Sequence, residues 1–202
     1  MKKFLYILAF LSICCFESNS HPLTDNATTT MTFEDNLATP KVSQRYSKAV
    51  GRHISMIGGK FEEKGFGVRT VRNGEVLLIS LPAEKLFMPN ETELMDEASA
   101  TLGYFKQAVT HPESYRLVIG VYADDTGDDE YSLQLTKERA LSIRDFFKTL
   151  SDNIQQNIDY YWFGNNRYVV PNTSVSNRAA NRRVEIYIIP EMHIIEASKA
   201  QH

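Results

Sequence analysis

The sequence predicts an α+β fold in two layers, a mixed sheet with two helices packed on one face. Short runs rich in β-branched and aromatic residues alternate with longer segments whose apolar residues recur every three or four positions. Strands that alternate with helices imply a sheet that carries the helices on a face. The 202 residues, 43% of them hydrophobic, suffice for one core.

The first two strands form a predicted hairpin. Two apolar runs, 68–71 and 76–81, flank Asn73-Gly74. Both turn residues tolerate the positive φ that a tight hairpin turn requires. Pro82 ends the second run.

Helices and strands alternate through the rest of the fold. A helix over 92–109 follows from its apolar spacing, with Asn90 or Thr92 as its cap and His111-Pro112 as its end. The other predicted elements are a short helix over 44–57 ended by Gly58-Gly59, a strand over 115–122, a helix over 133–150, a strand over 158–163, a polar loop over 164–177 and a strand over 183–189.

The first 20 residues are typical of an export signal. Lys2 and Lys3 supply positive charge, an apolar run over 4–16 follows, and Ser18-Asn19-Ser20 is a small-residue cleavage site. The run is shorter than the roughly 20 residues of a membrane-spanning helix. We expect a signal over 1–20, a tether with the short helix over 21–60, a domain over 61–190 and a tail over 191–202.

Both cysteines, Cys14 and Cys15, lie inside this signal. Cleavage after Ser20 would leave no disulfide, thiol nucleophile or thiolate metal site. Alternatively, Leu11-Ser12-Ile13-Cys14 has the outline of a lipoprotein box, although Ile13 is bulky for one. Lipidation at Cys14 or Cys15 would tether the protein to the outer membrane.

Composition and motifs argue against nucleic-acid binding and catalysis. Loss of the signal removes two lysines and one glutamate, so the net charge goes from −3 to −4, which disfavours polyanions. The chain has no G-x-S-x-G or H-E-x-x-H motif. The acidic loop that starts at Asp124 departs from a calcium loop, with Asp129 sixth and Leu135 twelfth. We expect no enzyme, no metal and no other cofactor.

One residue interrupts the apolar pattern of the second long helix. Arg139 lies four residues from both Leu135 and Ile143, where a hydrophobe is expected. A guanidinium there must reach solvent or meet a carboxylate, because an unpaired buried charge is costly. Asp124, after the preceding strand, is the candidate partner. A stripe through Ala140 instead would move Arg139 to the margin.

Four sequence motifs follow one another between about Val76 and Ile189. They are Leu78-Ile79-Ser80-Leu81-Pro82 through Leu86-Phe87, Gly120-Val121-Tyr122-Ala123-Asp124-Asp125-Thr126-Gly127, Tyr131-Ser132-x-x-Leu135-Thr136-x-x-Arg139-Ala140, and Asn172-x-Ser174-x-x-Asn177-Arg178-x-x-Asn181-Arg182-Arg183-Val184-Glu185. Together they resemble the OmpA-like peptidoglycan-binding domain of outer-membrane proteins, peptidoglycan-associated lipoproteins and flagellar stator subunits. The resemblance implies the OmpA-like two-layer sandwich.

By this resemblance, the domain would hold the free amino-acid end of diaminopimelate in the peptide stem of peptidoglycan. Asp124 matches the position that pairs with the ligand ammonium, and Arg139 the position that pairs with its carboxylate. An arginine fork meets a carboxylate bidentately, which suits that role. The other positions expected to bind the ligand are Thr126, Ser132, Arg178 and Arg182.

The chain departs from the family pattern at a few positions. Tyr122-Ala123 replaces His-Thr in the loop, and Ser132 and Met88 stand where Asn and Asp are frequent. Asn177 replaces a glycine and would keep its left-handed turn. We expect altered packing and polar contacts around the pocket, with the charged pair still in place.

Some of these residues also have structural interpretations. Adjacent strand residues point to opposite faces, so Arg182 and Arg183 would not serve one pocket. For Arg178, Arg182 and Arg183, the alternative roles are structural ion pairs with Glu185 or contacts at the edge of the sheet. The aromatic run over 160–163 would place half of its rings in the core rather than form a carbohydrate-stacking surface.

These observations predict a non-catalytic protein of a diderm envelope, in the periplasm or on the periplasmic face of the outer membrane. It would bind peptidoglycan and anchor the envelope to the cell wall. The alternative is an interaction or assembly protein that keeps the fold, no longer binds peptidoglycan and docks another envelope protein.

Overall fold

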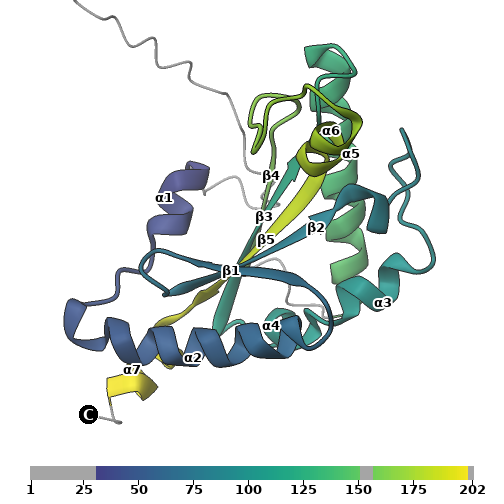
Figure 1. Ribbon diagram of the computed structural model, residues 1–202. Coiled ribbons are helices and arrows are strands. Elements are labelled where there is room, and N and C mark those ends of the chain that lie inside the picture. Colours follow the sequence, from purple (N-terminus) through teal and green to yellow (C-terminus); the bar gives the residue numbers. More distant parts are fainter. Residues whose placement is uncertain (1–30, 151–156, 200–202) are drawn as a thin grey trace, which may run out of the picture.

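The computed structural model describes residues 31–150 and 157–199 (Figure 1). Its elements are α1 (Phe33–Ala38), α2 (Gln44–Glu62), β1 (Gly67–Val71), β2 (Val76–Pro82), η1 (Ala83–Lys85), α3 (Ala98–Gly103), α4 (Lys106–Thr110), β3 (Tyr115–Tyr122), α5 (Asp129–Lys148), β4 (Ile158–Trp162), α6 (Val175–Asn181), β5 (Arg183–Pro190) and α7 (Met192–Lys199). The export signal and both lipidation candidates, Cys14 and Cys15, lie outside the described residues.

The strands form one five-stranded sheet in the order β1-β2-β5-β3-β4. β3 and β4 are parallel, and all other neighbours are antiparallel. β5 pairs with both β2 and β3, and every one of its residues is buried. The predicted α+β class with a mixed sheet is confirmed.

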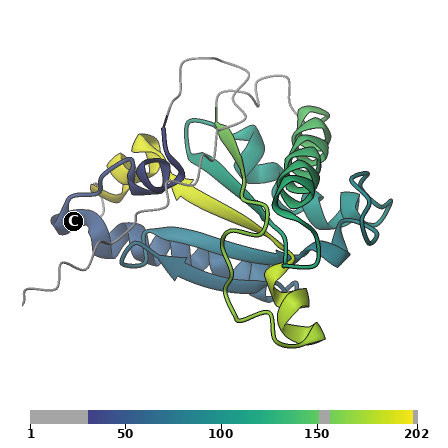
Figure 2. The same ribbon diagram turned by 90° about the horizontal axis from the view of Figure 1, so that it is seen from above.

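Different layers cover the two faces of the sheet (Figure 1, Figure 2). The two long helices, α2 and α5, pack on one face, where Ile54 and Ile143 share an apolar cluster with Ile79 of β2. Residues of α3, α4 and α7 belong to the same cluster. The opposite face carries α1, whose Phe33 packs edge-on against Tyr161 of β4. Strand alternation separates the two cores.

The hairpin of β1 and β2 is confirmed. Val71 pairs with Val76, and both Asn73 (φ 55°) and Gly74 (φ 87°) have the positive φ expected of them. Arg72 also has a positive φ of 51°, so the connection is longer than a two-residue turn.

The prediction that Gly58-Gly59 ends the first helix is wrong, because α2 continues through both glycines to Glu62. Gly58 is buried against the hairpin. A Cβ added there would lie 3.0 Å from Leu77 Cδ1 and 3.3 Å from Val68 Cγ1. The missing side chain therefore lets the helix approach the hairpin closely.

The single helix predicted over 92–109 is replaced by α3 and α4, with an irregular segment before them. Neither Asn90 nor Thr92 caps a helix, since α3 starts only at Ala98 and Asn90 has a φ of 63°. A bridge between Phe87 and Leu94 folds this segment back on itself. Tertiary contacts thus override the helical spacing of the apolar residues.

Helices also occupy parts of the segments predicted as a tether and a tail. Thr32 caps α1 by accepting a hydrogen bond from Asp35 N at 3.1 Å, and Phe33 is buried. At the other end, Ile195 of α7 joins the main core. No helix in 31–150 or 157–199 is long and apolar enough to cross a membrane.

The aromatic run over 160–163 lies entirely in the interior. Tyr160 belongs to the main core, and Tyr161 and Phe163 belong to the core on the opposite face. Both faces of β4 are covered, so more of the run is buried than the half predicted, and these rings form no carbohydrate-stacking surface.

Candidate functional site

A pocket lies at one end of the sheet, where three strand ends meet. Because β5 is antiparallel to both neighbours, its start lies beside the ends of β2 and β3. Arg183 pairs with Pro82 on one side and with Tyr122 on the other. Just beyond these pairs, Ala83 N donates a hydrogen bond to Arg182 O at 2.9 Å. The topology therefore brings three distant parts of the chain to one place.

This pocket has a volume of about 210 Å³. It brings together five of the six residues predicted to bind a ligand, which are Asp124, Thr126, Ser132, Arg139 and Arg182. The other lining residues are Ala83, Glu84, Phe87, Met88, Pro89, Asn90, Ala123, Gly127, Tyr131 and Leu135.

Asp124 is a buried carboxylate whose two oxygens are both engaged. Only 3% of the residue is exposed. Its Oδ1 accepts hydrogen bonds from Thr126 N at 3.1 Å and Thr126 Oγ1 at 2.5 Å, and its Oδ2 pairs with Arg182 Nη1. Burial favours the neutral acid, but these hydrogen bonds and the Arg182 charge outweigh it and lower the pKa of Asp124. Asp124 is therefore ionised at neutral pH.

Arg139 lines the same pocket and holds its rim. The residue is 4% exposed. Its Nε donates to Glu91 O at 2.9 Å and its Nη2 to Met88 O at 3.3 Å. The guanidinium carbon lies 4.9 Å from the centroid of the Phe87 ring. These contacts fold the irregular segment before α3 against α5.

The ion pair in this pocket joins Asp124 to Arg182, and not to Arg139 as the sequence suggests. Burial lowers the pKa of Arg139, Tyr131 partly offsets this, and the nearby charge of Arg182 adds to it. Two guanidinium groups therefore share the pocket. The buried stripe of α5 runs through Ala140, Ile143 and Phe147, as in the second interpretation of the helix, but Arg139 is also buried and does not lie at the margin.

The start of α5 is fixed against the pocket by Gly164. This glycine has a φ of 53°, and a Cβ added to it would lie 3.1 Å from Leu133 N. Its N–H donates to Thr136 Oγ1 at 3.0 Å, and its carbonyl accepts from Ala123 N at 2.7 Å. Ser132, which is buried, therefore lies next to the Asp124 loop.

Arg178 is the one predicted ligand residue that does not line the pocket. It lies in α6, and its Nη1 donates to Asn172 O at 2.9 Å. Asn177 is also part of α6, so its predicted left-handed turn is wrong. The amide of Asn177 instead donates to Pro171 O at 2.8 Å.

Arg183 points to the opposite face of the sheet, as alternation predicts. Its Nε donates to Glu185 Oε1 at 2.8 Å, and its guanidinium carbon lies 3.8 Å from the centroid of the Tyr122 ring. Tyr187 also donates to Glu185, at 2.7 Å. Burial raises the pKa of Glu185, but the Arg183 charge and these hydrogen bonds outweigh it, so the pKa is lowered. This cluster supports the sheet.

The pocket contains two acidic and two basic side chains, Glu84, Asp124, Arg139 and Arg182. Glu84 carries no sequence signal beyond its place after the second strand, whereas Phe87 and Tyr131 lie inside the matched motifs. Within 31–150 and 157–199, no group of three or more His, Cys, Asp or Glu side chains could hold a metal ion.

Residues 86–182 match the model of the OmpA family. The chain contains an OmpA-like domain. The matched range includes Asp124, Arg139 and Arg182, so most of the charged pocket belongs to the OmpA-like domain. No curated protein matches the chain.

Solved structures share the fold of this OmpA-like protein. A MotB-like protein from Desulfovibrio vulgaris is 21% identical, with a TM-score of 0.62 over 73% of this chain and 97% of that one. The cell wall anchor of the T6SS from Pseudomonas aeruginosa is 17% identical, with a TM-score of 0.57 over 68% and 97%. The periplasmic domain of Helicobacter pylori MotB is 16% identical, with a TM-score of 0.53 over 67% and 88%. At these identities the likeness concerns the fold.

Proposed function

We propose that this protein binds peptidoglycan through the charged pocket of its OmpA-like domain and so anchors the cell envelope to the wall. The ligand group is the zwitterionic end of diaminopimelate in the peptide stem. The observation that carries the proposal is a pocket with two carboxylates and two guanidinium groups, of which Asp124 and Arg139 are almost fully buried. Buried opposite charges suit a ligand that carries both signs.

Arg139 supplies the carboxylate site. A guanidinium has five N–H donors. Glu91 and Met88 accept two hydrogen bonds, from Nε and Nη2, which leaves the Nη1 and Nη2 edge to meet a ligand carboxylate bidentately. Because its rim contacts hold the guanidinium in place, little side-chain entropy is lost on binding.

Asp124 supplies the ammonium site, with Glu84 as a second carboxylate in the pocket. Asp124 is ionised, but its Oδ2 already pairs with Arg182. The side chain of Arg182 is 36% exposed, so it can turn away from Asp124 at small cost. In our mechanism the ligand ammonium replaces the Arg182 guanidinium at Oδ2 of Asp124. Thr126 keeps the Asp124 carboxylate oriented through its hydrogen bond to Oδ1.

The structural relatives support an envelope role. One of them is described as a cell wall anchor and another as the periplasmic domain of MotB. We place this protein in the periplasm or on the periplasmic face of the outer membrane, as a binding protein and not an enzyme. Neither histidine nor cysteine lines the pocket, which leaves it without a usual nucleophile–base pair.

One observation favours the alternative of an assembly protein that docks another envelope protein. Both oxygens of Asp124 are already satisfied within the chain, by Thr126 and Arg182. A domain that has lost its ligand would keep such an internal pair for stability. The two hypotheses therefore differ in what happens to wall binding when the pocket changes.

Cosedimentation with purified diaminopimelate-type peptidoglycan tests the proposal. We expect the wild type to pellet and both Asp124→Asn and Arg139→Ala to bind at least about tenfold more weakly, since a charge-assisted hydrogen bond contributes about 1.5–3 kcal/mol. Lysine-type peptidoglycan, which lacks the side-chain carboxylate, should bind weakly. The matched control Arg52→Ala removes an exposed charge from α2 and should bind normally.

Circular dichroism and thermal unfolding of each variant separate binding from folding. If Arg139→Ala unfolds the protein, the arginine is structural and its assignment to the ligand fails. If the folded wild type stays in solution, the assembly hypothesis replaces the proposal.

A further inference from the structure

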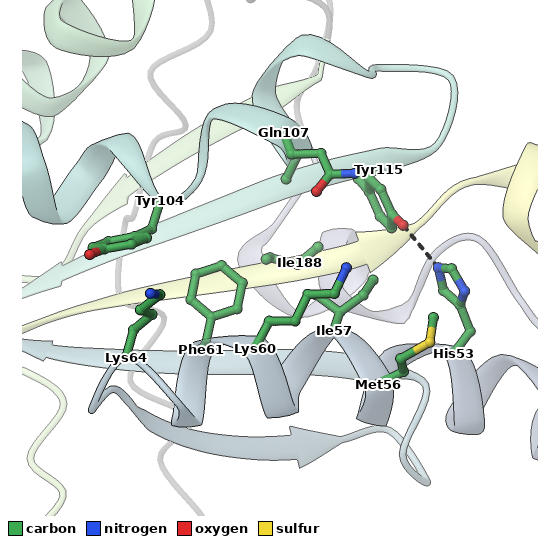
Figure 3. Close-up of a pocket in the computed structure, with 11 residues that line it drawn as sticks. His53, Met56, Ile57, Lys60, Phe61, Lys64, Tyr104, Gln107, Tyr115 and Ile188 are labelled. Atoms are coloured by element: carbon green, nitrogen blue, oxygen red, sulfur yellow. Dashed lines mark hydrogen bonds between the residues drawn. The ribbon is translucent and has the colours of Figure 1, made fainter.

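A second, larger cavity lies away from the charged pocket, in a groove between α2 and the α3–α4 region (Figure 3). Its volume is about 350 Å³, within the range of small-molecule sites. The lining residues are His53, Met56, Ile57, Lys60, Phe61, Lys64, Tyr104, Gln107, Ala108, Tyr115 and Ile188. It shares no residue with the charged pocket.

The floor of the groove is apolar and its mouth exposes apolar surface. Phe61, Ala108 and Ile188 are buried at the base. At the mouth, Met56 is 59% exposed and Tyr104 is 49% exposed. An apolar ligand body would cover these side chains, and the area removed from water would favour binding.

Two lysines make the groove positively charged. Lys60 lies in the last turn of α2 and Lys64 in the turn that follows the helix, and their side chains rise on either side of the Phe61 ring (Figure 3). Two ammonium groups on the same edge of the groove repel one another. No carboxylate lines the groove, and neither lysine forms an ion pair within the described ranges 31–150 and 157–199. An anion placed between them would relieve this repulsion.

His53 closes one end of the groove as a neutral group. Its Nε2 lies 2.9 Å from the hydroxyl oxygen of Tyr115, and Figure 3 shows this hydrogen bond at the edge of the cavity. Burial and the charge of Lys60 both lower the pKa of His53, so the imidazole is uncharged at neutral pH. The positive charge of the groove therefore comes from the lysines.

We propose that this groove binds a free alkyl carboxylate, with its chain on Phe61 and its carboxylate between Lys60 and Lys64. An apolar floor, an exposed apolar mouth and two ammonium groups on one edge match the two ends of such a molecule. A polar peptide stem would leave the apolar surface uncovered. This site is independent of the charged pocket, and its ligand belongs to a different chemical class.

The test is a chemical-shift titration of the ¹⁵N-labelled protein with sodium octanoate, 1-octanol and octylammonium, three probes with the same number of carbon atoms and different head groups. Octanoate should shift the amides of Tyr104 and Ala108. 1-Octanol should bind about threefold or more weakly because it forms no ion pair with the lysines, and octylammonium should bind more weakly still because the lysines repel it. The double variant Lys60→Gln/Lys64→Gln should bind octanoate and 1-octanol alike. Lys48→Gln, an exposed lysine earlier on α2, should change nothing.

Charge reversal keeps the test decisive. Lys64 is exposed, so Lys64→Glu should fold normally and lose its preference for octanoate over octylammonium, because the new carboxylate offsets the charge of Lys60. Equal affinity of the wild type for all three probes would overturn the proposal, as would shifts that map outside the groove. Neither result bears on peptidoglycan binding, because the groove and the charged pocket share no residue.

Discussion

At the scale of single residues, two carboxylates of this protein are held as ions by different partners. Asp124 lies in the charged pocket and pairs with Arg182, whose partial exposure leaves it free to move. Glu185 lies on the opposite face of the sheet and pairs with Arg183, which is as buried as Glu185 itself. The first arrangement can exchange partners with a ligand. The second can only stabilise the fold.

We predict that Glu185→Ala destabilises the protein by about 3–5 kcal/mol, because it leaves the Arg183 charge buried and unpaired. Urea unfolding of the variant measures this loss. Glu84→Ala is the control, since Glu84 is exposed and should change the free energy of unfolding little. A loss below about 1 kcal/mol for Glu185→Ala would show that water reaches Arg183.

At the scale of elements, the helix–hairpin contact depends on a missing side chain. Gly58 and Gly59 are neighbours in α2, yet they meet opposite environments. A Cβ on Gly58 would press on Leu77 and Val68, whereas a Cβ on Gly59 would meet nothing within 4 Å. Gly58 is therefore needed for close packing against the hairpin, whereas Gly59 has room for a side chain.

The glycines provide a matched pair of substitutions. Gly58→Val should destabilise the protein by about 1–3 kcal/mol through overpacking. Gly59→Ala should stabilise it by up to about 1 kcal/mol, because alanine has the better helix propensity. Thermal unfolding measures both changes, and the two should have opposite signs. If both variants lower the melting temperature, α2 ends at the glycines after all.

At the scale of the whole molecule, the acids and the histidine whose pKa values are lowered by folding all make the protein less stable at low pH. His53, Asp124 and Glu185 all have a lower pKa in the folded protein than in a free chain. As the pH falls, the unfolded chain therefore binds more protons than the folded protein, and the free energy of unfolding decreases. The carboxylates also need their charge for the ion pairs that hold the pocket and the sheet.

We predict a melting temperature that is level between about pH 7 and pH 9 and falls in two stages below about pH 7. The contribution of His53 is present above its unfolded pKa of about 6.5 and is lost as the pH drops through the lower folded value. The contributions of Asp124 and Glu185 are present above about pH 4 and are lost below it. Unfolding across a pH series measures both stages, and His53→Gln should remove the first alone. A melting temperature that rises between pH 7 and pH 5 would contradict this sign.

Local patterns predicted the elements whose signals are strong and repeated. The hairpin around Asn73-Gly74 and the strand over 115–122 form as expected, because turn chemistry and apolar runs are local properties. The prediction of a single helix over 92–109 is wrong, because the hydrogen bonds from Arg139 and the Phe87–Leu94 bridge hold the start of this segment in an irregular conformation. Phe33 is an isolated apolar residue in a polar segment, and only the tertiary structure shows that it belongs to the core.

The sequence by itself determined the α+β class and the OmpA-like motifs, and five of the six residues that it predicted to bind a ligand line the charged pocket. Only the tertiary structure decided that Asp124 pairs with Arg182 and that Arg139 supports the rim. It alone also formed the apolar groove between α2 and the α3–α4 region. Motif positions follow local chemistry, whereas partners and cavities depend on where segments far apart in the chain meet in space.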